Sequence, residues 1–165
     1  MPVLYCSNWV FCLLFSGFRK NGFEHLQKGV YIVMELNLNG KVVVVTGSSG
    51  IGEETAMEFA REGCEVTIAS RSEKKLAEAA GRFEVEGFQV HTQVVDVSKP
   101  EDISALGEKV FQQFGRIDVW INNAGGNITK PFLELTVEDW NFVISTNMTS
   151  VFWGTHVAVD YMRRT

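Results

Sequence analysis

The chain has 165 residues, of which 45% are hydrophobic and 21% charged, which is typical of one globular domain with a sizeable core. The formal net charge of -5 argues against nucleic acid as the main partner, because phosphate backbones attract basic surfaces. The three cysteines, Cys6, Cys12 and Cys64, have neither CxxC spacing nor the count of a disulfide framework. This usage favours a reducing cytoplasm, and we expect no metal site.

Residues 1–34 differ in character from the rest and are interpreted as a leader. Residues 3–18 are apolar and aromatic-rich, but they are too short and too interrupted for a membrane span. Arg19 and Lys20 follow this stretch, whereas a signal peptide carries its positive charge ahead of it. Three interpretations of these residues stay open: a disordered leader, a weak membrane-associating segment, and upstream sequence that is not native. The last is favoured because Met34 is followed by a sensible domain start, and no firm membrane association is expected.

From residue 41 onward, short β-branched runs alternate with longer segments of helical periodicity. This alternation predicts an α/β domain over residues 35–165, with a doubly wound parallel sheet and helices on both faces. Strands are expected at residues 42–46, 65–69, 89–95 and 117–121. Helices are expected at residues 51–62, 72–86, from 98 to about 114, from 136, and at 150–163.

Two of the expected helices begin with capping residues. Ser98 and Glu101 have the spacing of a capping box, and Thr136 and Asp139 have the same kind of cap. In the first helix, Ile51 is expected on the apolar face.

The glycine-rich run Thr46–Gly52, TGSSGIG, lies between a buried strand and a helix start. Glycine there permits positive φ, close approach of the backbone to a pyrophosphate, and tight packing of the helix on the strand. The helix amides would then face the phosphates. No Gly-Lys-Ser/Thr follows, which disfavours a P-loop; the alternative is a plain tight turn. The predicted cofactor-binding residues here are Gly47, Ser48, Ser49, Gly50, Ile51 and Gly52.

The second expected strand leads into Ser70-Arg71-Ser72. An acidic residue at this place would bind the ribose 2′-hydroxyl of NAD, and the chain has none there. Arg71 instead offers a planar cation for the 2′-phosphate of NADP, although a solvated surface arginine is the alternative. We therefore predict NADP in preference to NAD, with Arg71 and Ser72 at the site.

Asn122-Asn123-Ala124-Gly125 follows the fourth expected strand. Together with the TGxxxGIG loop, the pair Asp96-Val97 and Asn147, this NNAG motif resembles the short-chain dehydrogenases/reductases over about residues 36–165. Within that family, the sequence resembles members of the 3-oxoacyl reductase and glucose dehydrogenase type. The resemblance implies a Rossmann-type fold, an NAD(P)-dependent oxidoreductase acting on a carbonyl/alcohol pair of a small molecule, and a homo-oligomer for the full-length protein.

The resemblance also implies roles for single residues. Asp96 and Val97 would contact adenine, the cofactor would lie against Asn123, Ala124 and Gly125, and Asn147 would be catalytic by holding a water in the proton relay. From the residues alone, Asp96 could instead cap a turn at a strand end, and Asn147 could be an ordinary polar helix residue. For Asn122 a structural role is favoured.

Three further residues of the family mechanism are a serine, a tyrosine and a lysine four places after the tyrosine. The printed sequence contains no Tyr-x-x-x-Lys, and the residue four places after Tyr161 is Thr165. The catalytic role is therefore not assigned to Tyr161. We expect a C-terminally truncated domain that is inactive as given, and the alternative function is an inactive dinucleotide-binding module. Substrate and direction of hydride transfer stay open.

Overall fold

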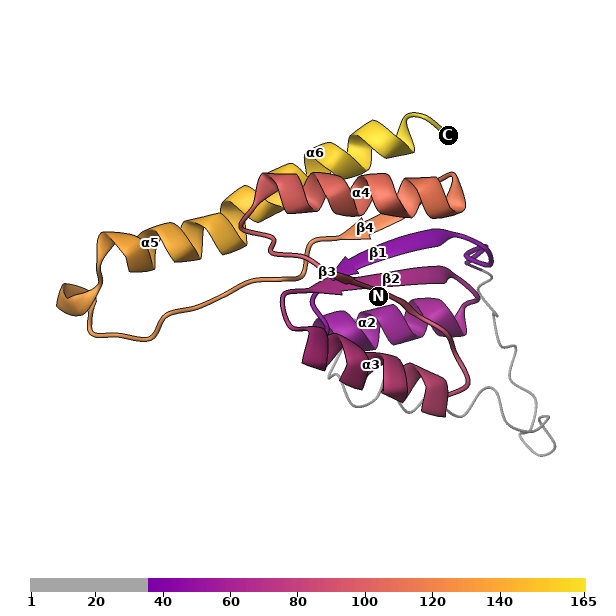
Figure 1. Ribbon diagram of the computed structural model, residues 1–165, viewed down its shortest axis with the longest axis horizontal. Helices are drawn as coiled ribbons and strands as arrows, with labels where there is room; N and C mark the ends of the chain where they lie inside the picture. Colours follow the sequence, from indigo (N-terminus) through magenta and orange to yellow (C-terminus); the bar gives the residue numbers. More distant parts are fainter. Residues whose placement is uncertain (1–35) are drawn as a thin grey trace, which may run out of the picture. The chain divides into compact units, whose positions relative to one another are not determined.

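The computed structural model describes residues 36–165, of which Asn37–Thr165 form one compact unit (Figure 1). The expectations for the leader, residues 1–34, lie outside the described residues. Within the described part of the chain, no helix is both long and apolar enough to cross a membrane.

The described residues form a four-stranded parallel sheet in the order β3-β2-β1-β4. The strands are β1 (Val42–Thr46), β2 (Glu65–Ser70), β3 (His91–Val94) and β4 (Val119–Ile121). The α-helices are α2 (Ile51–Arg61), α3 (Glu73–Val85), α4 (Pro100–Phe114), α5 (Val137–Ile144) and α6 (Ser150–Met162). A 3₁₀-helix, η1 (Phe132–Glu134), precedes α5, and a π-helix, η2 (Ser145–Thr149), joins α5 to α6. The predicted α/β Rossmann-type fold is confirmed.

The central strand β1 is buried on both faces, which explains its unbroken run of valines. Val43 and Val45 pack against α2 and α3, whereas Val42 and Val44 pack against α4 and α6. Figure 1 shows these two helix pairs on opposite sides of the sheet. Each such side chain contributes roughly 1.5–3 kcal/mol by leaving water, so the strand anchors both layers of the core.

Two strand predictions were too long. β3 covers only His91–Val94, and β4 begins at Val119. Ile117 is nevertheless buried, and the Asp118 amide donates to the Val42 carbonyl at 2.9 Å. The chain therefore reaches the sheet before β4 takes up regular pairing.

The capping box at Thr136 and Asp139 is present, but the one predicted at Ser98 is wrong. Lys99 is the N-cap of α4, because Pro100 is pre-organised for the first helical position. The Ser98 hydroxyl donates to Asp96 at 2.8 Å instead of capping the helix.

Ile51 does not lie on the apolar face of α2. The residue is 78% exposed, because it is the first residue of the helix and stands at the glycine loop rather than over the sheet.

The last two expected helices follow one another through η2 without a break. α6 packs closely on α4 at Gly107, where a Cβ would lie 2.9 Å from Cε2 of Tyr161. The Tyr161 ring also packs against the Phe111 ring in a tilted arrangement, with centroids 5.0 Å apart. Tyr161 therefore serves the packing of α6 on α4.

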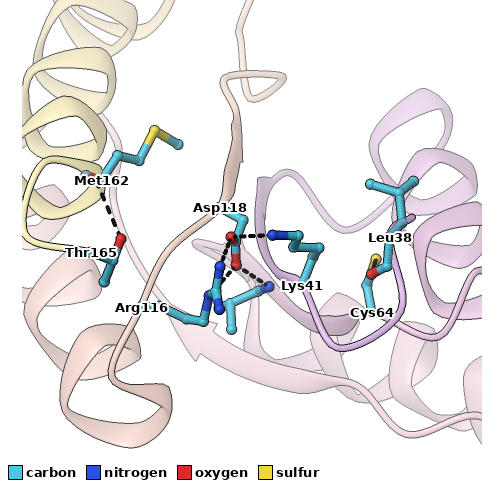
Figure 2. A network of polar contacts seen from close by, with 8 residues as sticks. Leu38, Lys41, Cys64, Arg116, Asp118, Met162 and Thr165 are labelled. Carbon is cyan, nitrogen blue, oxygen red and sulfur yellow. Dashed lines mark hydrogen bonds and ion pairs between the residues drawn. The ribbon is translucent and has the colours of Figure 1, made fainter. Parts of the chain in front are cut away.

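A charged network joins the amino ends of β1 and β4 (Figure 2). The Asp118 carboxylate accepts hydrogen bonds from the Val42 amide at 2.9 Å, from Lys41 Nζ at 3.3 Å and from Arg116 Nε at 2.8 Å. Burial alone would raise the pKa of Asp118. The bonds from Arg116, Val42 and Lys41 outweigh it and lower that pKa below its ordinary value. The ionised carboxylate thus fastens the two strands.

We expect Asp118→Asn to lower the free energy of unfolding by about 1–2 kcal/mol at pH 7. Because the folded-state pKa is depressed, the carboxylate's contribution is present above the unfolded-state pKa of about 3.9 and is lost as the pH falls through the folded-state value. Urea unfolding at pH 7 and at about pH 3 measures both effects. Asp160→Asn, at an exposed ion pair on α6, is the matched control and should change little. If Asp118→Asn lowered the free energy of unfolding equally at both pH values, the proposed role of the ionised carboxylate would be wrong.

Candidate cofactor-binding site

The glycine loop joins the carboxyl end of β1 to the start of α2. Gly47 has φ +108° and Gly50 has φ +59°, both in the region that side chains disfavour. Gly50 is the N-cap of α2. Because glycine has no side chain, it gives the free amides at the start of the helix no side-chain acceptor. A Cβ on Gly50 would meet no described atom within 4 Å. An uncapped helix start with open space beside it suits a phosphate group.

Residues of the loop differ in their exposure. Ser48 is buried, whereas Ser49, Gly50 and Ile51 are exposed. The exposed residues are the ones that can approach a bound molecule through side chain or backbone.

A hydrogen-bonded clasp connects the end of β1 to the NNAG segment after β4. The Thr46 hydroxyl accepts bonds from the amides of Asn123 and Ala124, each at 3.0 Å, and donates to the Ile121 carbonyl at 3.2 Å. The Asn123 amide group donates in turn to the Thr46 carbonyl at 3.0 Å. Thr46 belongs to the glycine-rich motif but is not among the predicted site residues, since its contacts depend on β4 lying beside β1.

The Asn123 side chain lies directly beneath the glycine loop. A Cβ on Gly47 would stand 2.5 Å from Asn123 Nδ2, and one on Gly52 would also collide with that atom. Both glycines are therefore required by packing inside the protein, in addition to the approach of a cofactor that their pattern predicts.

Asn122 has the structural role that was favoured. Its Oδ1 accepts from Trp120 Nε1 at 3.0 Å, and its Nδ2 donates to the Thr155 hydroxyl at 3.2 Å. It thereby ties the end of β4 to α6.

Asn147 lies within the π-helix η2 and binds the backbone that follows the NNAG motif. Its Nδ2 donates to the carbonyls of Gly126 at 2.7 Å and Val143 at 2.8 Å, and its Oδ1 accepts from the Gly126 amide at 3.3 Å. A Cβ on Gly125 would lie 2.6 Å from that Oδ1. π-turns are frequent at functional sites, and this one brings Asn147 to the edge formed by the clasp. Its catalytic role stays a prediction.

Arg71 and Ser72 follow β2 at the same edge of the sheet. Arg71 is exposed and forms no ion pair with the described residues, and its guanidinium carbon lies 5.8 Å from the centre of the Phe142 ring. Ser72 is the N-cap of α3, where its hydroxyl accepts from the Lys75 amide at 3.3 Å. The guanidinium is thus available to a ligand, while the Ser72 hydroxyl already serves the helix.

Asp96 caps a turn, as its alternative interpretation proposed. Its Oδ1 accepts from the amide of Ser98 at 3.1 Å and from the Ser98 hydroxyl. Burial alone would raise the pKa of Asp96, but the bonds from Ser98 and the charges of Arg71 and Lys99 lower it below its ordinary value. The Val97 side chain is buried in the core beside α4, so only the backbone of Val97 can face a ligand.

Comparison with known proteins shows which family the chain belongs to. The sequence model of the family described as short chain dehydrogenase matches residues 41–165. The 3beta-hydroxysteroid dehydrogenase 1 of Eggerthella lenta is 39% identical over 127 residues, which are 76% of this chain and 49% of that protein. The chain spans about half the length of the curated relatives it matches.

Two solved structures have the same arrangement. L-Sorbose reductase from Gluconobacter frateurii, complexed with NADPH and L-sorbose, has a TM-score of 0.73 at 36% identity, covering 79% of this chain and 50% of the other. A short chain dehydrogenase/reductase from Burkholderia phymatum in complex with NAD has a TM-score of 0.72 at 30% identity, covering 76% and 45%. On its motifs, its fold and these matches, the chain belongs to the short-chain dehydrogenase family.

Proposed function

We propose that this chain holds a nicotinamide dinucleotide at the carboxyl edge of its sheet. We further propose that the protein it represents is an oxidoreductase acting on a carbonyl/alcohol pair of a small molecule. The observation that carries the proposal is the uncapped start of α2 beside the open space at Gly50. The clasp of Thr46 and Asn123 fixes this loop. When bound, the cofactor would supply or accept the hydride.

Different residues at this edge would contact different parts of the cofactor. The amides of the exposed loop residues 49–51 would receive the pyrophosphate, because the positive end of the α2 dipole lies there. Asp96, held ionised by Ser98, would accept a hydrogen bond from the adenine amino group. Ala124 and Gly125 would leave room for the cofactor against the backbone. Asn147, fixed between Gly126 and Val143, would position the water of the proton relay.

We propose NADP as the preferred cofactor. Arg71 is exposed at the end of β2, and residues 69–72 include no acid that would bind a 2′-hydroxyl and repel a 2′-phosphate. The guanidinium keeps its N–H donors for a phosphate, to which it can bind in a bidentate way.

Arg71→Leu is expected to weaken NADPH binding about ten- to hundred-fold and to leave NADH binding unchanged, because a charge-assisted hydrogen bond to the 2′-phosphate is lost. Calorimetric titration of each cofactor into the chain measures both constants. Arg163→Leu, which removes an exposed arginine after α6, is the control and should change neither. Equal loss for both cofactors, or no loss for NADPH, would exclude Arg71 as the residue that selects NADP.

A second candidate function is dinucleotide binding without catalysis by these 165 residues. It is favoured by the absence of Tyr-x-x-x-Lys from the printed sequence and by the packing of Tyr161 against Phe111. Assay of the purified chain with NADPH and a panel of ketones and aldehydes tests it. Turnover above the rate without protein would exclude this candidate.

We also propose a cytoplasmic homo-oligomer without nucleic acid as a partner. Among the residues described, large apolar side chains on η1, α5 and α6 are exposed, including Phe132, Leu133, Trp140 and Phe152. Large exposed apolar side chains on neighbouring elements are frequent in association surfaces. Light scattering after size-exclusion chromatography should give a dimer or larger, and a monomer at about 50 μM would contradict it.

A further inference from the structure

Phe142 of α5 is the residue that faces the guanidinium of Arg71 from across the candidate site. The Arg71 Cζ atom lies 5.8 Å from the ring centroid, within the range in which a cation is attracted to the face of an aromatic ring. The two residues are 71 positions apart in the sequence and come from different sides of the site, the end of β2 and the helix α5.

The Phe142 ring packs against hydrogen-bonded backbone. A Cβ on Gly126 would lie 2.7 Å from its Cζ and 2.8 Å from its Cε1, so the ring packs directly on the Gly126 backbone. Asn147 binds both the amide and the carbonyl of Gly126. The Phe142 carbonyl accepts bonds from the hydroxyls of Ser145 at 3.0 Å and Thr146 at 2.7 Å. The ring therefore packs against a segment of backbone that these hydrogen bonds hold.

Contact with a ring face has a different consequence from an ion pair. A carboxylate partner would occupy the N–H groups of Arg71, whereas an aromatic face leaves all five of them free for an anion. A long arginine side chain loses rotamer freedom when it binds a ligand, and a support that restricts it beforehand reduces that loss. Arg71 and Asp96 also attract each other, since the charge of Arg71 helps to lower the pKa of Asp96.

We propose that Phe142 is a positioning residue that orients Arg71 for the 2′-phosphate and so strengthens the selection of NADP. This inference rests on the proposed function, in which Arg71 receives that phosphate. Phe142 would act only through Arg71 on the 2′-phosphate, and NADP carries this phosphate whereas NAD does not. Its removal must therefore change the affinity for NADPH and not that for NADH.

The test uses calorimetric titration of NADPH and NADH into the 165-residue chain and its variants. Phe142→Leu should weaken NADPH about two- to five-fold and leave NADH unchanged, and Phe142→Met should do the same. Phe142→Tyr, which keeps the ring face, should retain the affinity for NADPH. In the Arg71→Leu background, Phe142→Leu should have no further effect, because the residue it supports is gone.

The outcomes separate this inference from the proposed function. If Arg71→Leu weakens NADPH but Phe142→Leu and Phe142→Met do not, the positioning role is overturned and the choice of NADP stands. Equal weakening of both cofactors, or an undiminished effect in the Arg71→Leu background, also overturns it, because Phe142 then acts through the fold. If Arg71→Leu leaves NADPH binding unchanged, the proposed preference for NADP fails and the positioning role fails with it.

Discussion

Gly47→Ala is expected to lower the free energy of unfolding by about 2–4 kcal/mol and to weaken cofactor binding more than ten-fold. Gly47 has φ +108°, where a side chain is strained, and the added Cβ would stand 2.5 Å from Asn123 Nδ2. Relief of that contact must displace Asn123, which binds the Thr46 carbonyl. The substitution therefore disturbs the loop and the clasp together.

Gly81→Ala is the matched control for this substitution. Gly81 lies within α3, and a Cβ there would meet no described atom within 4 Å. Because alanine favours a helix, this variant should be as stable as the original chain or up to about 1 kcal/mol more stable. Urea unfolding and cofactor titration of both variants make the comparison. Equal stability and equal affinity for Gly47→Ala and the original chain would show that the loop tolerates a side chain.

Asn123→Asp is expected to lower the free energy of unfolding by about 2–4 kcal/mol at pH 7, although it changes only one atom of the side chain. The Nδ2 donor faces the Thr46 carbonyl at 3.0 Å, and the substitution places a charged acceptor against that carbonyl. Neither group then has a donor, and the half-buried position limits their access to water. The glycine loop above the side chain should loosen, and cofactor binding should weaken with it.

Asn141→Asp makes the same chemical change at an exposed position of α5 and serves as the control. It should alter stability by no more than about 0.5 kcal/mol, as surface substitutions usually do. Thermal and urea unfolding of the two variants at pH 7 give the difference. If the two substitutions prove equally mild, the clasp contributes little to the fold.

The features that the sequence predicted well are those set by local pattern. The β1 strand was placed at its observed bounds because four valines and Thr46, all β-branched, lie between Lys41 and Gly47. The capping box at Thr136 follows from residues three positions apart. Four motifs in family order were sufficient for the fold.

The errors and omissions have physical causes. At Ser98, the local competition between Asp96 and Pro100 decided where α4 begins, and a capping pattern alone does not weigh those two. The role of Thr46 depends on β4 lying beside β1, a contact between residues more than 70 positions apart. Phe142 was not singled out for a similar reason, since its partner Arg71 lies on a different element.

The π-helix around Asn147 also escaped prediction. Ser145–Thr149 consist mostly of residues with low helix propensity, but nothing in their pattern distinguishes a wider turn from an ordinary helical one. What the sequence offered was the asparagine itself, a residue with poor helix propensity, and the family motif that it matched.

Calorimetric titration of NADPH and NADH into the purified 165-residue chain is the most direct test of the claim that its sheet edge holds a nicotinamide dinucleotide. We predict saturable binding of one molecule per chain, tighter for NADPH than for NADH, and weakened by Gly47→Ala. Absence of saturable binding of either cofactor at millimolar concentration, in a chain that unfolds cooperatively, would contradict it.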